Sequence, residues 1–299
     1  MGGGRSSPLV SCDTGTVWTA GLQEWFQANG RHDLPWRLTT DPWAVLVSEV
    51  MLQQTSVARV LPRWDRFMTR WPSAAACAAD PLDEVLREWH GLGYPRRARA
   101  LWLVAATVSE HGWPRDETGL RALPGIGVYT ARALLAFSDL GVDAQAPPRD
   151  VNLGRVAARA ALGCEPHEVA PALLDTALVV GRPPAMSMRD YSYALFDVGA
   201  TLCRARPDCA ACPLREACAW RAGGRAVALA APPQAPYRGS VRQLRGALLE
   251  QALRTPQPTA GELAMAVSAV PGATADRIRA ALDGLIADGL IAGELALRQ

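Results

Sequence analysis

Apolar residues recur at intervals of three and four along most of this chain, and the strict alternation typical of β-strands is scarce. Glycine and proline mark the breaks between the periodic segments. The pattern predicts helices at residues 17–29, 41–55, 57–71, 82–89, 96–110, 118–123 and 190–202. We therefore expect a mainly α protein.

The segment LPGIGVYTARALLAF, residues 123–137, predicts a tight glycine turn that opens directly into a helix. Gly125 and Gly127 can adopt backbone angles that are closed to other residues. A turn without side-chain bulk at a helix N-terminus presents backbone N–H groups and a partial positive charge, which suits a phosphate group. An ordinary helix–loop–helix turn is the alternative that the four residues alone leave open.

Composition limits the chemistry more than it identifies it. The 299 residues are enough for two or three compact units, and the net charge of +2 leaves any attraction to nucleic acid to local patches. All 31 basic residues are arginine, so a mechanism that needs a catalytic lysine is excluded. The chain has no run of about 18 apolar residues and no apolar leader, so we expect neither a membrane span nor export.

Two acidic residues occupy positions where a carboxyl group can do chemistry. Glu49 lies among the apolar residues of the predicted helix at 41–55, where a carboxyl group must find partners or be kept protonated. Asp150 precedes the apolar periodicity of Val151, Leu153 and Val156. A surface ion pair for Glu49 and a helix cap for Asp150 are the alternatives.

Residues 91–101, GLGYPRRARAL, place arginines beside an aromatic ring at a glycine turn. This composition suits nucleic acid, because arginine binds phosphate and Tyr94 can stack on a base or wedge between bases. The neutral hydrogen-bonding residues 53–55 at the end of the earlier helix can reach base edges. A solvated basic helix face is the alternative for the arginines.

Four of the seven cysteines are clustered near the end of the predicted helix at 190–202: Cys203, Cys209, Cys212 and Cys218. Without a secretory signal, such clustering favours metal ligation over disulfides. Four thiolates can hold a [4Fe-4S] cluster, and a structural zinc ion is the alternative. The remaining thiols, Cys12, Cys77 and Cys164, are expected to be buried or incidental.

The C-terminal part has a different composition. A linker rich in proline, alanine and glycine covers residues 221–239. Beyond it, helices are predicted at 241–253, 259–267 and 274–288, and a small hairpin at 289–297. This outline is typical of a winged-helix-like module.

Taken together, the motifs resemble one known family. The segments LPWR, SEVMLQQT, GLGYPRRAR, LPGIGVYTA and DVNLGRV precede the cysteines in that order. They resemble the helix-hairpin-helix DNA glycosylases and, among these, the A/G-specific adenine glycosylases of the MutY type, over roughly residues 18–220. The tail is similar to the short extension of actinobacterial members.

The resemblance implies a helix-hairpin-helix glycosylase fold, in which a six-helix barrel joins an iron–sulfur cluster domain. It places an N-terminal segment that packs with the cluster domain at 1–37, the barrel at 38–145, the cluster domain at 146–222, a linker at 223–239 and the winged-helix-like module at 240–299. It also implies a cytoplasmic, nucleoid-associated monomer that acts on double-stranded DNA containing an adenine mismatch.

The resemblance also assigns roles to residues. Glu49 matches the general acid that protonates the adenine, and Asp150 matches the carboxylate that stabilises the sugar cation. Tyr129 and Asn152 match active-site residues, and the cysteine run matches the ligands of the [4Fe-4S] cluster. The residues expected to contact DNA are Gln53, Gln54, Thr55, Tyr94, Arg97, Gly125, Gly127 and Thr130. Among them, Gln54 and Tyr94 resemble residues that probe the opposite base and wedge the stack while adenine is flipped out.

Related enzymes remain as alternatives. An endonuclease III-type lyase needs lysine where this chain has Tyr129, whereas thymine- or uracil-mismatch glycosylases also have tyrosine there. The SEVMLQQT segment favours adenine. A DNA-binding or scaffold module without catalysis gives no reason for two distant carboxylates to converge.

The chain departs from the family in two ways. The first cysteine gap is five residues, one shorter than is usual in the family. The tail is too short for the MutT-like domain with which longer members recognise 8-oxoguanine, so the sequence leaves open whether 8-oxoguanine or guanine is preferred opposite adenine.

Overall fold

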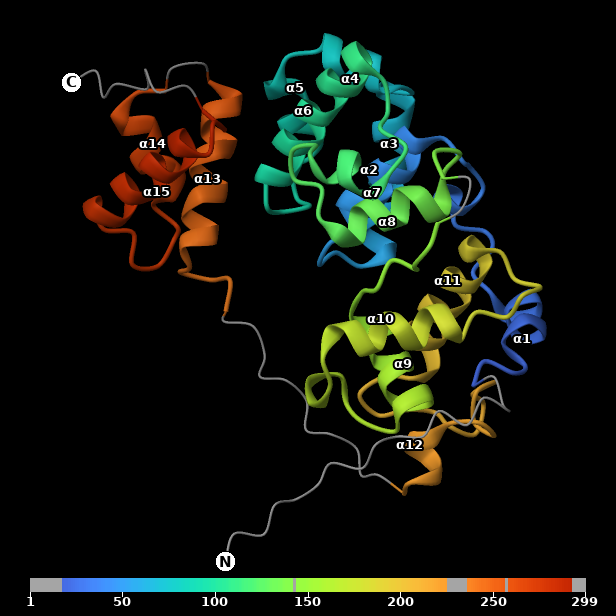
Figure 1. The fold of residues 1–299 in the computed structure, drawn as a ribbon. Helices are drawn as coiled ribbons and strands as arrows, with labels where there is room; N and C mark the ends of the chain where they lie inside the picture. Colours follow the sequence, from blue (N-terminus) through green and yellow to red (C-terminus); the bar gives the residue numbers. More distant parts are fainter. Residues whose placement is uncertain (1–17, 142–143, 225–235, 256–257, 292–299) are drawn as a thin grey trace, which may run out of the picture. The chain divides into compact units, whose positions relative to one another are not determined.

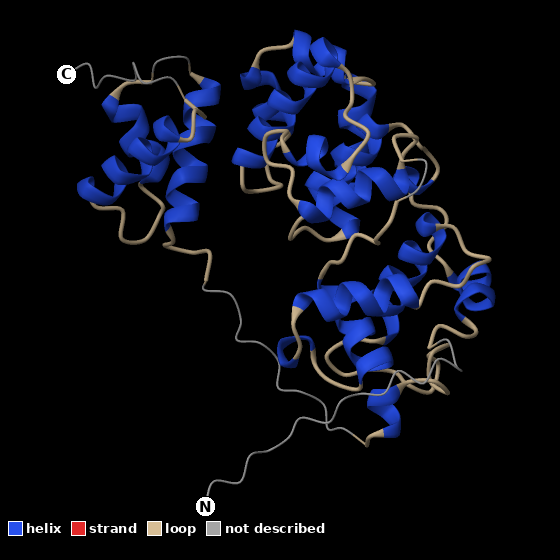
Figure 2. Cartoon of the chain, in the orientation of Figure 1, coloured by secondary structure: helices blue, strands red, loops and turns tan. Residues whose placement is uncertain are grey.

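The computed structural model describes residues 18–141, 144–224, 236–255 and 258–291. Every regular element within these ranges is helical, so the prediction of a mainly α protein is confirmed (Figure 2). No described helix is both long enough and apolar enough to cross a membrane. The chain forms two compact units. Unit 1 comprises Met1–Thr40, Arg115–Glu117 and Gly127–Ala230, and unit 2 comprises Asp41–Pro114, Thr118–Ile126 and Ala231–Gln299.

Unit 2 contains the first helices after the LPWR turn and the C-terminal helices (Figure 1). Its first group is α2 (Pro42–Leu52), α3 (Val57–Arg70), α4 (Ala74–Ala79), α5 (Leu82–Glu88), α6 (Arg96–His111) and α7 (Glu117–Arg121), whose first residue falls in unit 1. Its second group is α13 (Val241–Arg254), α14 (Ala260–Val267) and α15 (Ala275–Ala287).

Helix α2 is the most deeply buried helix of the first group. Its cap is Asp41, whose side chain accepts hydrogen bonds from Trp43 N and Ala44 N at 3.2 Å each. Pro42 occupies the first turn, where the missing N–H costs nothing. The Trp43 indole donates to the carbonyl of Trp71 at 2.9 Å, and Phe67 packs edge-on against Trp71. These aromatic contacts fix α2 against α3.

Unit 1 contains the remaining elements. They are α1 (Leu22–Asn29), η1 (Pro35–Arg37), α8 (Val128–Phe137), α9 (Val151–Leu162), η2 (Pro166–Glu168), α10 (Pro171–Val180), α11 (Met188–Asp197), the π-helical turn η3 (Val198–Leu202) and α12 (Ala219–Ala222). Phe137 at the end of α8 stacks on Tyr193 of α11 with 4.3 Å between ring centroids, which joins the helix after the glycine turn to this unit.

A buried carboxylate ties the LPWR turn to α11. Asp197 accepts from Arg31 Nε at 2.6 Å and from both terminal nitrogens of Arg37 at 2.8 and 2.9 Å. Burial acts to raise the pKa of Asp197, but the hydrogen bonds and charges of the two arginines hold it below its ordinary value. The guanidinium of Arg37 also lies 4.3 Å from the ring centroid of Tyr193.

Most predicted helices are confirmed, and the differences have local causes. The helix predicted at 17–29 begins at Leu22, after a left-handed Gly21, and residue 17 lies outside the described residues. The helix predicted at 41–55 ends at Leu52. The helix predicted at 190–202 becomes a π-turn at Val198. The sequence pattern does not predict α4, α10 or the short α12.

The C-terminal prediction is confirmed in its three helices. The hairpin predicted at 289–297 falls largely outside the described residues, so the winged-helix-like module and the other domain boundaries stay predictions. Cys77 and Cys164 are buried as expected, and Cys12 lies outside the described residues.

Candidate functional site

Asp150 is held rigidly at the N-terminus of α9. Its Oδ1 accepts from the backbone N–H groups of Asn152 and Leu153 at 2.7 and 2.8 Å, and its Oδ2 accepts from Asn152 Nδ2 at 2.7 Å. Burial raises the pKa of Asp150 above its ordinary value, while these hydrogen bonds and the positive charge of Arg155 act in the opposite direction. Asp150 is therefore the helix cap that the sequence allows, and its carboxylate is fixed in position and largely removed from water.

The contacts of Asp150 continue to the first cysteine. Asn152 Oδ1 accepts from Arg155 at 2.8 Å, and the same guanidinium donates to the carbonyls of Gly199 at 2.8 Å and Cys203 at 2.6 Å. A Cβ atom on Gly199 would lie 2.7 Å from Asn152 Cβ, so the π-turn can approach α9 this closely only with glycine at that position. One continuous chain of hydrogen bonds thus joins Asp150 to the backbone of Cys203.

Glu49 lies in unit 2, on α2, and is 6 % exposed. Its neighbours on the helix, Ser48 and Val50, are buried as well, which makes this an apolar helix with one embedded carboxyl group. Because Glu49 is buried, the alternative of an ion pair on the helix surface is wrong.

Two exposed side chains meet beside the end of α2. The Tyr94 hydroxyl donates to Gln54 Oε1 at 3.0 Å, across 40 positions of the chain. Among the described residues, Gln54 and Tyr94 are the only non-glycine residues with positive φ, at 56° and 50°. Left-handed backbone costs energy in such residues and is typical of functional loops. The structure therefore brings together two of the predicted DNA contacts.

Arg97 holds the loops that carry this pair. Its guanidinium donates to the carbonyls of Val50 and Gln53 at 2.7 and 2.6 Å, and to those of Leu92 and Gly93 at 3.1 Å each. Burial lowers the pKa of Arg97. The side chain predicted to contact DNA is engaged with backbone carbonyls of both loops.

The remaining predicted contacts lie along the glycine turn and the end of α2. Gly125 has a φ of +74°, and a Cβ atom there would lie 2.7 Å from Ala100 Cβ, so this turn requires glycine. Gly127 has ordinary φ and open space around it, and it caps α8. Behind it, Tyr129 lies edge-on to Phe196, and Thr130 is buried. The Thr55 hydroxyl donates to Gln53 O at 3.3 Å.

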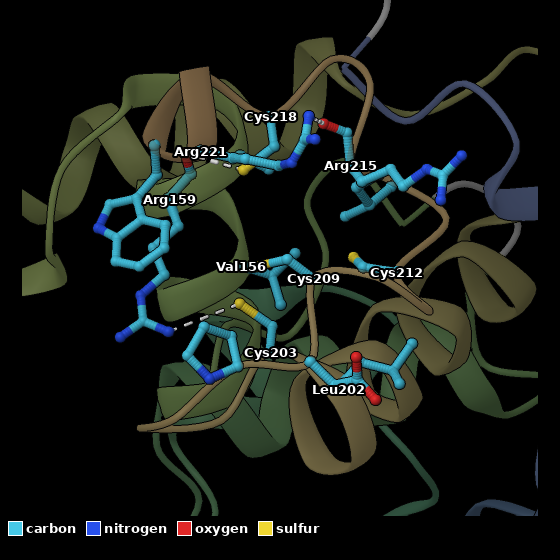
Figure 3. A pocket seen from close by; sticks show the side chains of 14 residues that line it. Val156, Arg159, Leu202, Cys203, Cys209, Cys212, Arg215, Cys218 and Arg221 are labelled. Carbon is cyan, nitrogen blue, oxygen red and sulfur yellow. Dashed lines mark hydrogen bonds between the residues drawn. The ribbon is translucent and has the colours of Figure 1, made fainter. Parts of the chain in front are cut away.

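The four clustered cysteines line one pocket of unit 1, between α9 and the loop 203–218 (Figure 3). Arg159, which is 2 % exposed, donates to Cys203 Sγ at 3.9 Å and to Arg204 O at 2.7 Å. Its Nε donates to Glu165 at 2.9 Å. Burial raises the pKa of Cys212 to about 11 and also raises that of Cys203. At neutral pH these thiols therefore lose their protons only when a positively charged group, such as a metal, binds them.

The four thiols together form a donor set for a metal group. Within the described part of the chain, no group of three or more His, Cys, Asp or Glu side chains is arranged to hold a metal ion. The chemistry of four cysteine donors fits a [4Fe-4S] cluster or a structural zinc ion.

The predicted residues divide between the two units. Unit 1 holds Asp150, Asn152, Tyr129, Thr130, Gly127 and the four cysteines, and unit 2 holds Glu49, Gln53, Gln54, Thr55, Tyr94, Arg97 and Gly125. Sequence analysis missed the roles of Arg155 and Arg159. Their spacing from Asn152 and from each other is that of one helix face, and that signal was present in the sequence.

Comparison with known proteins identifies the family of the chain. Residues 47–173 match the family model described as the HhH-GPD superfamily base excision DNA repair protein. A solved structure of a thermostable thymine-DNA glycosylase matches with a TM-score of 0.60 and 27% identity, covering 69% of this chain and 95% of that one. The family match and the fold therefore define a helix-hairpin-helix base excision repair protein.

Curated relatives narrow the class. Adenine DNA glycosylases of Mycolicibacterium smegmatis and Mycobacterium tuberculosis are each 41% identical to the chain over 90% of its length, covering 91% and 88% of those proteins. The chain belongs to the adenine DNA glycosylase family. The resemblance predicted from the motifs is confirmed for the helix-hairpin-helix glycosylase fold, for the adenine glycosylase family and for the similarity to actinobacterial members.

Proposed function

We propose that this protein hydrolyses the N-glycosyl bond of adenine mispaired with 8-oxoguanine or guanine in double-stranded DNA and leaves the strand intact. Adenine glycosylase activity follows from family membership, whereas the opposite base and the residue roles are our proposal. The observation that carries these roles is Asp150: a half-buried carboxylate that three hydrogen bonds fix at a helix N-terminus.

The proposed chemistry needs two carboxyl groups in opposite states. Glu49, embedded in apolar α2, donates its proton to a ring nitrogen of adenine while the bond between the base and C1′ breaks. Ionised Asp150 stabilises the positive charge that develops on the sugar and can bond to it transiently. Water then adds at C1′, and its proton returns to the carboxylate of Glu49. Asn152 orients Asp150 through its amide. Tyr129 is proposed to contact the extruded base.

Base extrusion is assigned to the loops of unit 2. Tyr94 wedges the base stack, and Gln54, bonded to its hydroxyl, probes the base opposite adenine. We assign Arg97 to positioning these loops instead of direct DNA contact, because four of its hydrogen bonds go to backbone carbonyls. Gly125, Gly127 and Thr130 are proposed to line the DNA phosphates.

We further propose that Cys203, Cys209, Cys212 and Cys218 hold a [4Fe-4S] cluster. The proposal is supported by the four thiols lining one pocket, because four cysteine thiolates are the ligand set of such a cluster. When bound, the group crosslinks the loop 203–218 and neutralises its thiolates. Arg159 donates to the Cys203 sulfur, and Arg155 holds the Cys203 carbonyl, so both keep the loop in register with α9. The protein is proposed to act as a monomer.

Excision assays on end-labelled duplexes test the proposal directly. We expect release of adenine opposite 8-oxoguanine and opposite guanine, with strand breakage only after heat or alkali. Glu49→Gln should abolish excision, because an amide cannot supply the proton. Release of thymine or uracil opposite guanine would instead favour a mismatch glycosylase. The similarity to a thymine-DNA glycosylase makes this the alternative to test. Normal turnover by Glu49→Gln would remove that residue from the mechanism.

A further inference from the structure

The C-terminal helices of unit 2 meet the helices α5 and α6 through arginines. Arg87 Nε of α5 donates to the carbonyl of Leu253, in the last turn of α13, at 3.1 Å. Arg96 Nε at the start of α6 pairs with Asp288 Oδ1, the C-cap of α15, at 3.4 Å. Helix C-terminal ends carry partial negative charge, so both contacts are electrostatically favourable.

A third arginine completes this contact surface. A Cβ atom on Gly289 would lie 2.7 Å from Arg99 Nε, so the end of α15 presses against the side chain of Arg99. Arginine side chains of α5 and α6 therefore make all three of these contacts with the C-terminal helices. The side chain of Arg96 remains 75 % exposed, and an exposed ion pair of this kind is weak and screened by salt.

The same arginines border the glycine turn. A cavity of about 390 Å³ is lined by Arg96 and Arg99 of α6, by Gly125 and Ile126 of the turn, and by Asp288. Asp288 is thus an anion placed among arginines, next to the turn that the proposed function assigns to DNA phosphate. Within the C-terminal helices, Asp288 also pairs with Arg245 of α13.

We propose that Asp288 is a displaceable intramolecular stand-in for a DNA phosphate. In the free protein, its carboxylate holds the C-terminal helices on Arg96. On duplex DNA, a backbone phosphodiester takes Arg96 and Arg99, and the C-terminal helices are released from α6. This inference rests on the proposed function, because the competing anion is the DNA backbone. The C-terminal helices thereby lower the affinity for DNA in general.

Duplex affinity measured against salt tests the competition. Asp288→Asn should bind an undamaged duplex about three- to tenfold more tightly, with a salt slope larger by about one phosphate contact. Arg96→Gln should bind more weakly, and the double variant should match Arg96→Gln, because the carboxylate acts only through that arginine. A double variant that binds more tightly than Arg96→Gln would overturn the inference, as would unchanged affinity of Asp288→Asn.

Two controls separate the contact from the folding of the C-terminal helices. Arg245→Gln breaks the internal pair of Asp288 but leaves its pair with Arg96, so the duplex affinity should not rise. Asp283→Asn removes an exposed carboxylate from the same helix and should leave the affinity unchanged. A rise in affinity with Arg245→Gln, equal to that of Asp288→Asn, would mean that loosened helices and not the freed arginine cause the effect.

Hydrogen exchange distinguishes failure of this inference from failure of the proposed function. Without DNA, Asp288→Asn should raise exchange at the end of α15 and the start of α6, whereas Asp283→Asn should not. Unchanged exchange in Asp288→Asn overturns the docking contact. With wild-type protein, an added duplex should likewise raise exchange in α15. Protection of α15 by the duplex would overturn release, and failure of the wild-type chain to bind any duplex would overturn the proposed function itself.

Discussion

The proposed functional residues of unit 1 and those of unit 2 are held in place by different kinds of interaction. In unit 1, Asp150 is fixed by groups within three residues of it, and the first turn of a helix supplies the donors. In unit 2, Gln54 and Tyr94 are fixed by each other across 40 positions, and Arg97 bonds the carbonyls of both their loops. The charged group Asp150 is thus positioned locally, whereas the pair Gln54 and Tyr94, which we propose probes the bases, depends on long-range contacts and a left-handed backbone.

The largest expected effect comes from removing the locally fixed charge. Asp150→Asn keeps an oxygen to accept the backbone hydrogen bonds but loses the negative charge. Excision should fall on the order of 10³-fold or more, because stabilisation of the sugar cation is lost in the transition state. Duplex binding should change by less than about threefold, because phosphate contacts dominate affinity. Single-turnover excision and duplex titration measure the two quantities.

Asp41→Asn is the matched control for that variant. Asp41 caps α2 with the same two kinds of backbone contact, so the substitution changes a capping carboxylate away from the proposed chemistry. It should leave excision within about twofold of wild type and cost less than about 1 kcal/mol in the free energy of unfolding. If Asp150→Asn behaved like Asp41→Asn, its carboxylate would be a helix cap and nothing more.

The next largest effect tests the long-range part. Arg97→Lys keeps the charge but replaces a planar fork with a single ammonium, which cannot reach the carbonyls of Val50, Gln53, Leu92 and Gly93 together. We expect excision to fall about tenfold or more, since small misplacements of positioning groups are costly. The salt slope of duplex binding should stay the same. A slope reduced by about one would show instead that Arg97 contacts a phosphate.

The difference between the two parts also explains what the sequence could predict. Asp150 was identifiable because a cap and the apolar periodicity after it are neighbours in the chain. Glu49 was identifiable in the same way, from apolar neighbours on its own helix. For Arg97 the sequence predicts a DNA contact, and nothing local indicates that carbonyls 44 and 47 positions away accept its hydrogen bonds. Local sequence patterns do not indicate which residues far apart in the chain contact one another.

The fold shows the same limit. Helix α4, AAACAA, has no polar face from which periodicity can be recognised, and it forms because Ser73 caps it through Ala76 N and because it packs on α6. The π-turn before Cys203 interrupts a sequence that continues the helical pattern, and it is stabilised by Arg155 from another helix. Both features are decided by tertiary contacts that a local window does not contain.

A smaller effect is expected from pH. Because burial raises the pKa of Asp150, excision should fall on acidification at a pH higher than an ordinary aspartate, near 3.9, would give. Asn152→Ala removes a hydrogen bond that lowers this pKa, so the acidic midpoint should move upward. Duplex binding measured at each pH separates loss of chemistry from loss of the complex. A midpoint that moves downward in Asn152→Ala would contradict the assignment.

The same shift has a consequence for stability, with the opposite sign to the usual aspartate. Since the folded pKa of Asp150 is raised, its contribution to the free energy of unfolding is present at low pH and lost as pH rises through the folded value. Ionised Asp150 therefore costs stability near neutral pH. Asp197, whose pKa is lowered by two arginines, behaves in reverse, and its contribution is lost as pH falls. Chemical denaturation of Asp150→Asn near pH 7 should show no loss of stability relative to wild type.

The smallest expected effect probes the link between the two left-handed residues. Tyr94→Phe removes only the hydroxyl that donates to Gln54 and keeps the ring that is proposed to wedge the stack. An exposed hydrogen bond contributes about 1 kcal/mol, so excision should fall about two- to fivefold. Gln54→Ala should lower excision by a similar factor, and the double variant should add little, because both changes break one contact.

Tyr237→Phe, at an exposed tyrosine in unit 2, is the matched control and should have no effect. Additive losses in the double variant would mean that Gln54 and Tyr94 act independently. The left-handed backbone at these two residues would then not serve to bring their side chains together.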